Sequence, residues 1–496
     1  MSFNKLQLKA MDLARKGNNV FLSGEAGTGK SFTTAKVISQ AYHRFKKPSA
    51  VCITASTGVA AVAIGGSTLH SWSGLGIAEG PKEELLLQAN ARPYVWKNTQ
   101  FLVIDEFPMI PCELFEKLEW IARMVRKDDR PFGGIQLFLV GDFAQLPPVV
   151  PKGKPRVHAF EAECWPGCMG TYVELQKVFR QKDVEFVEIL RHARMGCMPP
   201  DALAVLQKQV RKDNEPLPLR NGVAPTKLYC TKASVEAENK RALEMLEGDE
   251  VVFSCSDKSD GSPAGIRQLK FLQANLTTPS VLELKIGAQV MVTANMNVLF
   301  DGEDPHDPKA ERCAVVNGTR AVVHDMADDY VIVQLISGTL VRIDPYKWKR
   351  EVTHVKEQPG SRVPLVVKEV QASRTQIPLI LAWAVTIHKA QGATLDFMLA
   401  DLRGVFGDAQ AYVALSRATA LENLFLRPFD ASAFKASKKV MAFLESVRSA
   451  DNSLGESEAD REANREANRE AQSEAESEEE IQEEVRPHKR RRIQLE

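Results

Sequence analysis

Short apolar runs alternate with longer segments of helical periodicity through the first part of the chain. The runs occupy residues 20–22, 51–54, 101–104 and 137–140. Apolar runs of this length, separated by helical patterns, are typical of βα units, in which crossover helices join the strands of a parallel sheet. We therefore predict an α/β domain over residues 1–175. Its ligands are expected at the carboxyl ends of the strands.

A second alternating block begins near Ala224. A strand is predicted at residues 227–230 and a helix at residues 234–247. Parallel α/β character is expected to resume further on, at residues 379–384, 397–400 and 424–426. These segments predict a second α/β domain over residues 176–449.

The middle of this second domain has a different pattern. Residues 287–370 are rich in valine and contain the turn dipeptides Asn317-Gly318 and Ser337-Gly338. Valine favours strands, and such dipeptides favour tight turns between strands. We predict a small β-barrel of the SH3-like type, inserted around residues 315–372.

The last segment, residues 450–496, contains no aromatic residue and repeats Arg-Glu-Ala-Asn at residues 461–468. It cannot bury a core, so we expect either disordered chain or a solvated single helix. Residues 486–492 resemble a nuclear localisation signal; a solubilising or polyanion-contacting tail is the alternative.

Charge and cysteine content narrow the class of protein. The chain holds 64 basic and 64 acidic residues, but residues 1–450 alone hold 56 basic and 49 acidic residues. A mildly basic body fits a polyanionic partner, although charge alone is weak support. The eight cysteines form no Cys-x-x-Cys pair, so we predict neither a zinc site nor a disulfide framework, and expect reduced thiols. No apolar run approaches the roughly 18 residues of a membrane span.

The most informative motif is a complete phosphate-binding loop between an apolar run and a helical segment: Gly24, Glu25, Ala26, Gly27, Thr28, Gly29, Lys30 and Ser31. Its glycines let backbone N–H groups approach a triphosphate at the positive end of the following helix. Lys30 would reach the β and γ phosphates, and the Ser31 hydroxyl would hold Mg²⁺. An accidental glycine-rich turn is the alternative. We predict binding and hydrolysis of a nucleoside triphosphate.

Two further polar motifs follow apolar runs of the first domain. Asp105 and Glu106 end the run at residues 101–104. Asp105 would bind Mg²⁺, directly or through water, and Glu106 would polarise the attacking water. Gln145 follows the run at residues 137–140 and could sense the γ-phosphate; a rigid loop stopped by the two following prolines is an equal alternative.

Five strings beyond the phosphate loop identify a family resemblance: TASTGVAA, VIDEFPMI, GDFAQLPPV, TIHKAQGATLD and YVALSRA. In order and spacing they resemble the Pif (petite integration frequency) helicases, superfamily-one relatives of the RecD type. The likeness runs from about Asn4 to Phe429. It implies two RecA-like domains that move along single-stranded DNA in the 5′ to 3′ direction, driven by ATP.

The resemblance also implies roles for individual residues. Gln7 matches the adenine-reading glutamine, Arg180 in Phe179-Arg180-Gln181 matches an arginine that touches the γ-phosphate, and Arg417 matches the arginine finger of the last helicase motif. A guanidinium fork suits the charge that develops on a transferring phosphoryl group. Residues 183–196 resemble the family's signature helix.

Candidate DNA contacts come from both domains. Thr57, His70 and Trp72 lie in the first, and His388 and Lys389 lie in the second. Hydroxyls and cations can follow phosphates, and an aromatic ring can stack on an unpaired base. An isolated Trp is more often a core residue, which is the alternative for Trp72. In the polar segment from Thr386 to Gly392, contact with DNA or nucleotide is expected, and Gly392 is assigned to the nucleotide.

One departure from the family pattern follows the Asp-Glu pair, where Phe107-Pro108 replaces a small polar residue and an aliphatic one. Proline fixes φ and removes an N–H donor, so we expect an effect on the coupling of hydrolysis to DNA rather than on Asp105 or Glu106.

Together these features predict a monomeric ATP-dependent DNA helicase with ATP and Mg²⁺ as cofactors, no membrane association, and single-stranded DNA and duplex junctions as partners. The resemblance implies use in DNA repair, recombination or telomere maintenance, in the nucleus or alternatively the mitochondrion. An RNA translocase, a non-catalytic nucleic-acid-binding module and a small-molecule kinase are the alternatives. The kinase would leave Arg180, Gln145 and the second domain without a role.

Overall fold

The computed structural model describes residues 3–453 except 76–77, 79, 149, 151–154, 214, 305–306, 308–309 and 357–364. The chain divides into two compact units, residues 1–437 and residues 438–496. The described part of the second unit is the helix α14 (Lys438–Ser453). Residues 454–496 lie outside the described part, so the expectations for the charged tail and for its signal-like segment at residues 486–492 stay predictions.

The first domain is built on a six-stranded parallel sheet with the order β3-β2-β4-β5-β1-β6. Its strands are β1 (Val20–Gly24), β2 (Val51–Ala55), β3 (Ser67–Thr68), β4 (Phe101–Asp105), β5 (Gln136–Val140) and β6 (Thr171–Leu175). β1 and β5 are buried along their whole length. Helices cover both faces of such a sheet, which explains the uninterrupted apolar runs in the sequence.

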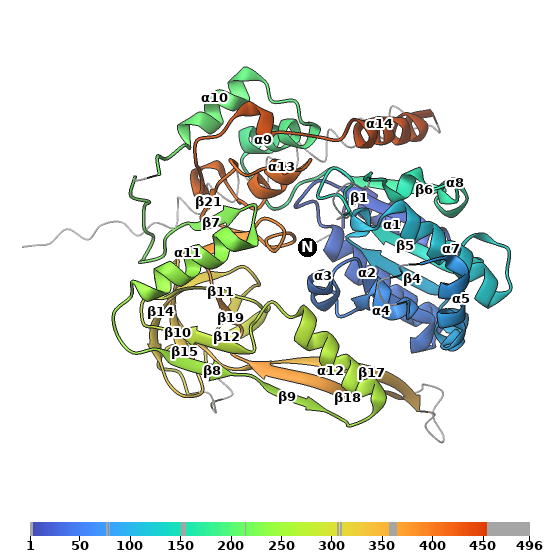
Figure 1. Ribbon diagram of the computed structural model, residues 1–496, viewed down its shortest axis with the longest axis horizontal. Coiled ribbons are helices and arrows are strands. Elements are labelled where there is room, and N and C mark those ends of the chain that lie inside the picture. Colours follow the sequence, from blue (N-terminus) through green and yellow to red (C-terminus); the bar gives the residue numbers. More distant parts are fainter. Residues whose placement is uncertain are drawn as a thin grey trace, which may run out of the picture. The chain divides into compact units, whose positions relative to one another are not determined.

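Helices surround this sheet (Figure 1). They are α1 (Lys5–Arg15), α2 (Lys30–Phe45), α3 (Gly58–Ala63), α4 (Leu69–Ser73), α5 (Lys82–Asn90), α6 (Pro93–Asn98), α7 (Cys112–Arg126) and α8 (Trp165–Cys168). Ala10 of α1 and Val37 of α2 share one core cluster with Val20, Val103 and Phe138 of the strands. The α/β prediction for the first part of the chain is confirmed.

A second, four-stranded parallel sheet has the order β20-β7-β21-β22. It consists of β7 (Thr226–Tyr229), β20 (Ala384–Thr386), β21 (Met398–Ala400) and β22 (Leu424–Leu426), with the helices α9 (Val184–Met195), α10 (Pro200–Lys208), α11 (Lys232–Glu244) and α13 (Gln410–Leu415). β7 precedes the antiparallel region in the sequence, whereas its partner β20 follows that region. The antiparallel region is therefore an insertion in an α/β domain.

The insertion is larger than residues 315–372. Seven antiparallel strands have the order β13-β12-β16-β15-β14-β11-β19: β11 (Gln289–Val292), β12 (Met296–Phe300), β13 (Arg312–Val315), β14 (Arg320–Met326), β15 (Val331–Leu335), β16 (Leu340–Ile343) and β19 (Leu379–Leu381). Residues 379–381 were expected in a parallel sheet, but β19 pairs antiparallel with β11. A short apolar run does not reveal its partner strand, which explains this error. In this sheet β13 is one edge strand and β19 is the other, and among the described residues these two edges are not paired with each other. Closure of the sheet into a small barrel therefore stays a prediction.

The turn dipeptides lie where strands end. Ser337-Gly338 joins the paired strands β15 and β16, whereas Asn317-Gly318 joins β13 to β14, which pair with other strands. The remaining elements of the insertion are β8 (Val251–Ser254) paired with β10 (Val281–Leu284), the sheet of β17 (Tyr346–Lys356), β18 (Leu365–Gln376) and β9 (Ser256–Ser259), and α12 (Pro263–Asn275).

The insertion contacts the first domain next to a predicted DNA motif. Arg350 of β17 donates a hydrogen bond to the Gly66 carbonyl. Gly58, at the start of α3, lies so close to Asn275 of α12 that a Cβ built on it would be 1.7 Å from Asn275 Oδ1. Only glycine fits at residue 58 in this arrangement.

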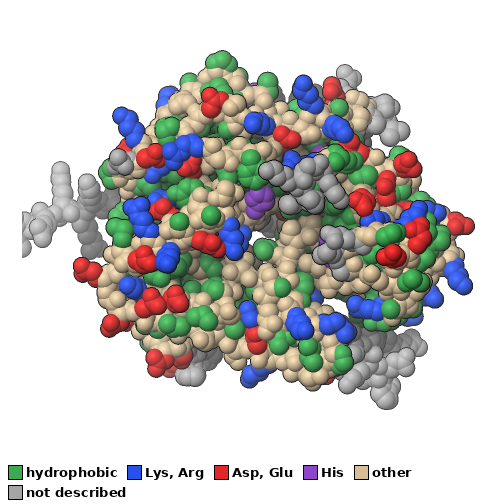
Figure 2. All heavy atoms as spheres, viewed as in Figure 1, with side chains coloured by type: hydrophobic (Ala, Val, Ile, Leu, Met, Phe, Trp, Pro, Cys, Tyr) green, Lys and Arg blue, Asp and Glu red, His purple; other side chains and the backbone are tan. Residues whose placement is uncertain are grey.

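Charges of both signs are interspersed over the face of the protein drawn in Figure 2. The excess of basic residues in residues 1–450 is therefore not gathered into one patch on that face. Among the helices of the described residues, none is both long and apolar enough to cross a membrane.

Candidate functional site

The phosphate-binding loop connects β1 to α2, as its sequence predicts, and two other segments pack on its glycines. Gly27 and Gly29 have φ angles of +84° and +85°, a left-handed region that favours glycine. A Cβ on Gly27 would lie 2.6 Å from the Cβ of Arg180, and one on Gly29 would lie 2.9 Å from Gln7 Nε2. The phosphate-binding loop therefore contacts Gln7, the candidate for reading the adenine, and Arg180, a candidate for binding the γ-phosphate.

Lys30 is folded onto the loop. Its Nζ donates hydrogen bonds to the carbonyls of Gly24 at 2.7 Å and Glu25 at 3.0 Å, and the Thr28 hydroxyl donates to the same Glu25 carbonyl at 2.9 Å. Burial lowers the pKa of Lys30, against the attraction of nearby carboxylates. Ser31 is exposed in the first turn of α2. These groups surround the space in which the positive end of α2 would meet a phosphate.

Asp105 and Glu106 lie at the carboxyl end of β4. Asp105 Oδ1 accepts a hydrogen bond from the Glu106 N–H at 2.9 Å. Burial, then the neighbouring Glu106 charge, raises the pKa of Asp105 to about 7. Burial also raises the pKa of Glu106, while Lys30 and Arg417 oppose this rise. Two half-buried carboxylates side by side are arranged to take up a cation or a proton.

Phe107 and Pro108, which differ from the family pattern, lie in the short 3-10 helix η2 (Phe107–Met109). The Phe107 ring is fully buried and stacks on Trp165, with 5.8 Å between ring centroids. Pro108 packs on Gly141, where a Cβ would lie 2.2 Å from the proline Cδ. Phe107-Pro108 therefore fixes the segment after Glu106 to the core and to the loop after β5.

The loop after β5 is held by an ion pair from α9. Arg194 donates from Nε to Asp142 Oδ2 at 3.0 Å and from Nη2 to Asp142 Oδ1 at 2.8 Å. Desolvation works to raise the pKa of Asp142, but the attraction of Arg194 outweighs it and lowers that pKa. Gln145, which is 7% exposed, belongs to the same loop, and its N–H donates to the Asp142 carbonyl at 2.9 Å. The signature-like helix thus supports the loop that carries the γ-phosphate candidate.

Both candidate arginines of the second domain face this region. Arg180 Nη1 donates to the Ser416 carbonyl at 3.1 Å. Arg417 is 1% exposed and donates from Nε to the Val413 carbonyl at 2.9 Å and from Nη2 to Ser416 Oγ at 2.8 Å. Burial, then the charge of Arg180, lowers the pKa of Arg417 to about 9. The two guanidiniums lie close enough to repel one another, so an anion between them would be stabilised.

Residues 4–196 match the family described as PIF1-like helicase. The crystal structure of the Pif1 helicase from Candida albicans is 34% identical, with a TM-score of 0.66, over 90% of this chain and 100% of that chain. The chain belongs to the PIF1-like helicase family. This result confirms the resemblance seen in the sequence.

Other members of the PIF1-like family extend the comparison. Bacteroides sp Pif1 in complex with ADP-AlF4 has a TM-score of 0.70 at 27% identity, covering 91% of this chain and 98% of that one. Bacteroides Pif1 bound to ssDNA has a TM-score of 0.57 at 27% identity, with the same coverage. The ATP-dependent DNA helicases RRM3 of Saccharomyces cerevisiae and PIF1 of Danio rerio are 35% and 36% identical over 88% and 90% of this chain. The chain spans 66% and 64% of the length of these two curated relatives.

Four contacts of this PIF1-like site were not predicted from the sequence. The Ala26 N–H donates to the Tyr412 hydroxyl of α13 at 3.0 Å. Arg191 of α9 pairs with Glu25 at 3.4 Å, and Gln391 donates to Glu106 at 2.9 Å. The Phe179 ring, 49% exposed, lies 3.7 Å from a Cβ built on Gly29. Tyr412 lies in the motif YVALSRA, and Gln391 lies in the motif TIHKAQGATLD. A sequence motif does not show which of its side chains contacts the other domain.

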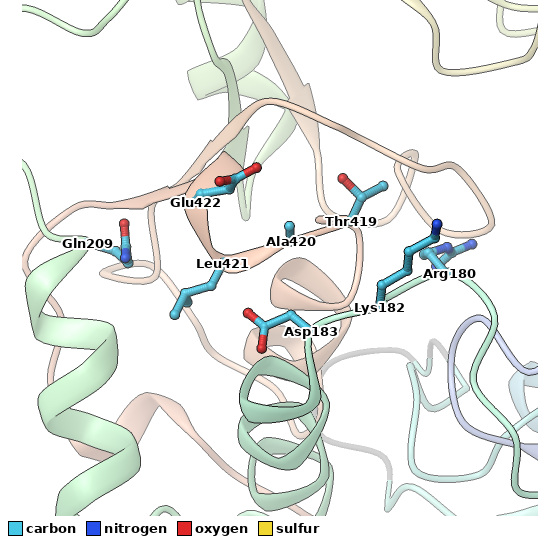
Figure 3. A pocket seen from close by; sticks show the side chains of 8 residues that line it. All are labelled: Arg180, Lys182, Asp183, Gln209, Thr419, Ala420, Leu421 and Glu422. Atoms are coloured by element: carbon cyan, nitrogen blue, oxygen red, sulfur yellow. The ribbon is translucent and has the colours of Figure 1, made fainter. Parts of the chain in front are cut away.

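A cavity of about 670 Å³ flanks Arg180 on the side of the second domain. In Figure 3, Arg180, Lys182 and Thr419 lie along one side, while Gln209 and Glu422 lie at the other. Its lining carries both signs of charge. Arg180 is the residue that this cavity shares with the contacts around the phosphate-binding loop.

The DNA candidates are placed differently from one another. The Thr57 hydroxyl caps α3 by accepting from the Ala60 N–H at 3.2 Å. His70 and His388 are half-buried, and burial lowers the pKa of both imidazoles. Lys389 and Gly392 are exposed, and Gly392 has a φ of +79°. These residues offer polar groups near the surface of both domains.

Trp72 belongs to the core. Its ring is 6% exposed, its Nε1 donates to Thr99 Oγ1 at 3.3 Å, and its centroid lies 4.7 Å from that of Trp96. The assignment of Trp72 to DNA needs an exposed ring face, so we replace it by the core interpretation. An aromatic residue surrounded by helices and a strand gains more from burial than from exposure.

Proposed function

We propose that this chain is an ATP-dependent DNA helicase, which translocates 5′ to 3′ on single-stranded DNA and unwinds duplex DNA. The observation that carries the proposal is the meeting of a phosphate-binding loop and two carboxylates of one parallel α/β domain with two arginines of another. An arrangement of this kind lets one nucleotide bridge two domains. The names of the relatives, and the nucleotide and ssDNA complexes of Bacteroides Pif1, support it.

We assign the nucleotide to the loop from Gly24 to Ser31, with Gln7 reading the adenine and Gly392 contributing from the second domain. Ser31 and Asp105 would hold Mg²⁺ through oxygen atoms, the ligand type that this ion prefers. No group of three His, Cys, Asp or Glu residues suited to a metal occurs in the described part of the chain. This fits Mg²⁺, which commonly takes one or two carboxylates together with phosphate and water. When bound, it would neutralise charge on the phosphates.

In the hydrolytic step, Glu106 would accept a proton from the attacking water. Its raised pKa favours proton uptake. Arg180 and Arg417 would turn from the backbone around Ser416 towards the charge that develops on the γ-phosphate, a contribution of about 10³–10⁵ in rate for arginine fingers in general. Gln145 would report the presence of that phosphate. Closure around ATP and opening after hydrolysis would then change the grip on DNA.

We assign the backbone of single-stranded DNA to Thr57 and His70 in the first domain and to His388 and Lys389 in the second. Contacts of hydroxyls and cations to phosphate carry no base identity, so no preference for a particular sequence is expected. We further propose that the protein acts as a monomer at duplex junctions, in DNA repair, recombination and telomere maintenance. Genome maintenance in the nucleus is the proposed setting, with the mitochondrion as the alternative.

The test is ATP turnover with single-stranded DNA, with single-stranded RNA, or with neither. We expect hydrolysis that is slow without DNA, is stimulated by single-stranded DNA, and falls at least about 100-fold in Lys30→Ala, since a charged group aimed at the transferring phosphoryl is lost. Lys36→Ala, which removes an exposed lysine of the same helix, is the matched control and should leave the rate unchanged. Stimulation by RNA alone would favour the RNA translocase. Rapid hydrolysis without nucleic acid, or insensitivity to Lys30→Ala, would overturn the proposal.

A further inference from the structure

One hydrogen bond between the two parallel α/β domains ends on the proposed catalytic carboxylate. Gln391 Nε2 donates to Glu106 Oε2 at 2.9 Å. Glu106 follows β4 of the first domain, and Gln391 belongs to the turn after β20 of the second. We infer that Gln391 is a positioning residue: it orients Glu106 and transmits DNA binding to the hydrolytic step. This inference rests on the proposed function.

The turn that carries Gln391 is fixed to its own domain by several hydrogen bonds. The Ile387 N–H donates to the Tyr229 carbonyl of β7 at 3.0 Å, and the Ala390 N–H donates to the Thr386 carbonyl at 3.0 Å. Arg417 Nη1 lies 3.5 Å from the Ala390 carbonyl, which accepts its hydrogen bond. A turn held in this way moves as one piece with β20. The Gln391 amide therefore follows any displacement of the second domain.

The same turn carries the proposed DNA contacts. Lys389 is exposed two residues before Gln391, and its N–H donates to Thr386 Oγ1 at 3.1 Å. His388 precedes it, and its carbonyl accepts from the Gln391 N–H at 3.3 Å. A DNA phosphate held by His388 and Lys389 would fix the turn on one side, while the Gln391 amide fixes Glu106 on the other. DNA binding and the orientation of the carboxylate are linked through one short turn of the chain.

The carboxylate needs such a partner. The terminal torsion of a Glu side chain is broad and two-fold, so the backbone does not set the direction of its oxygens. Glu106 also has φ 49° and ψ 38°, a left-handed conformation that residues other than glycine rarely adopt. A neutral amide can hold one oxygen without adding charge, which leaves Oε1 for the proton of water. A lysine or arginine in its place would add a positive charge that lowers the pKa of Glu106 and makes it a weaker base.

We expect Gln391→Ala to lower the DNA-stimulated kcat at least about tenfold, which corresponds to about 1.4 kcal/mol of the activation barrier. The KM for ATP and the Kd for single-stranded DNA should each stay within about twofold, while the slow turnover without DNA should fall less than the stimulated kcat, so that the ratio of stimulated to basal turnover decreases. Gln391→Asn, one methylene shorter, should behave in the same way because its amide falls short of Glu106. Gln391→Glu should lose at least as much, because two carboxylates would then face each other. A merely structural role would instead lower basal and stimulated turnover together, along with the Tm.

Gln273→Ala is the matched control. Gln273 Nε2 donates to Asp257 Oδ2, also at 2.9 Å, but from the exposed side of α12, so its loss should leave the ratio of stimulated to basal turnover unchanged. If the wild-type protein is stimulated by DNA and all three Gln391 variants keep that ratio within twofold, the inference is wrong and the proposed function stands. If the wild-type protein is not stimulated by DNA, the proposed function itself fails.

Discussion

The buried ion pair between Arg194 and Asp142 gives the sharpest test of how α9 supports the nucleotide site. The two side chains are 2% and 0% exposed and share two hydrogen bonds. Arg194→Met keeps much of the volume but leaves a buried carboxylate without its cation. Removal of one partner of a buried pair typically costs about 3–5 kcal/mol. In a large folding unit each kcal/mol of lost stability lowers the Tm by about 2 °C. The Tm of Arg194→Met should therefore fall by roughly 6–10 °C.

The loss of stability in Arg194→Met should also depend on pH. In the wild-type protein the folded pKa of Asp142 is lowered, so its contribution to stability is present above the unfolded pKa of about 3.9 and is lost as the pH falls through the folded value. Without Arg194, only the attraction of Lys30 and the hydrogen bond from the Ala144 N–H oppose desolvation, which is the largest influence on Asp142, so the folded pKa should rise. The variant then gains stability on protonation, and its Tm difference from the wild-type protein should narrow between pH 8 and pH 5.

Thermal denaturation followed by circular dichroism measures both effects. Arg191→Met is the matched control, because Arg191 stands on the same helix but is 43% exposed and pairs with Glu25 at 3.4 Å; exposed pairs contribute about 0–1 kcal/mol. The double variant Arg194→Met with Asp142→Leu should recover most of the Tm, but not the ATP turnover, since the loop of Gln145 loses its attachment. A Tm of Arg194→Met within 2 °C of the wild-type value at pH 8 would refute this reasoning.

Two further predictions concern the same domain. Because burial raises the folded pKa of Asp105 to about 7, above about 3.9 in the unfolded chain, the ligand-free protein should lose stability as the pH rises from about 4 to 7. Asp105→Asn should then raise the Tm at pH 8 in calorimetry without nucleotide, and a lower Tm would contradict this. Trp72→Ala should cost about 3–5 kcal/mol through the cavity it leaves, yet keep the DNA affinity of the folded protein within twofold in fluorescence anisotropy. Tyr94→Ala, at an aromatic residue that is 56% exposed, is its control; unchanged stability with a tenfold loss of affinity would restore Trp72 to the DNA site.

Much of the first domain follows from local sequence. The four apolar runs became β1, β2, β4 and β5, each within one or two residues of the expected bounds. Their uninterrupted apolar character reflects burial on both faces of a parallel sheet, which requires crossover helices of the kind the periodicity showed. The insertion was harder to delimit. β19 pairs with β11, more than 80 residues earlier, and nothing in a run of three apolar residues specifies such a partner.

The residues of the candidate site also fall into those that local sequence indicates and those that it does not. Lys30, Ser31, Asp105 and Glu106 could be predicted as candidates because the role proposed for each depends on a residue type at a fixed distance from the end of a strand, which is visible in the sequence. Trp72 was not settled by sequence, because a single ring suits either a core or a stacking surface. Its burial beside Trp96 depends on helices that are separate in the sequence.

Local sequence is enough to predict the phosphate-binding loop and the order along the chain of the strands around it, since these depend on neighbouring residues. The side chains from beyond the first sheet that meet this loop and its carboxylates become visible only in the folded chain. Tyr412 meets Ala26, Arg180 packs on Gly27, and Gln391 meets Glu106. The two hydrogen bonds among these contacts join residues that are 386 and 285 positions apart. Hydrogen bonds act over about 3 Å, so their partners are fixed by how the domains pack rather than by any pattern within one segment.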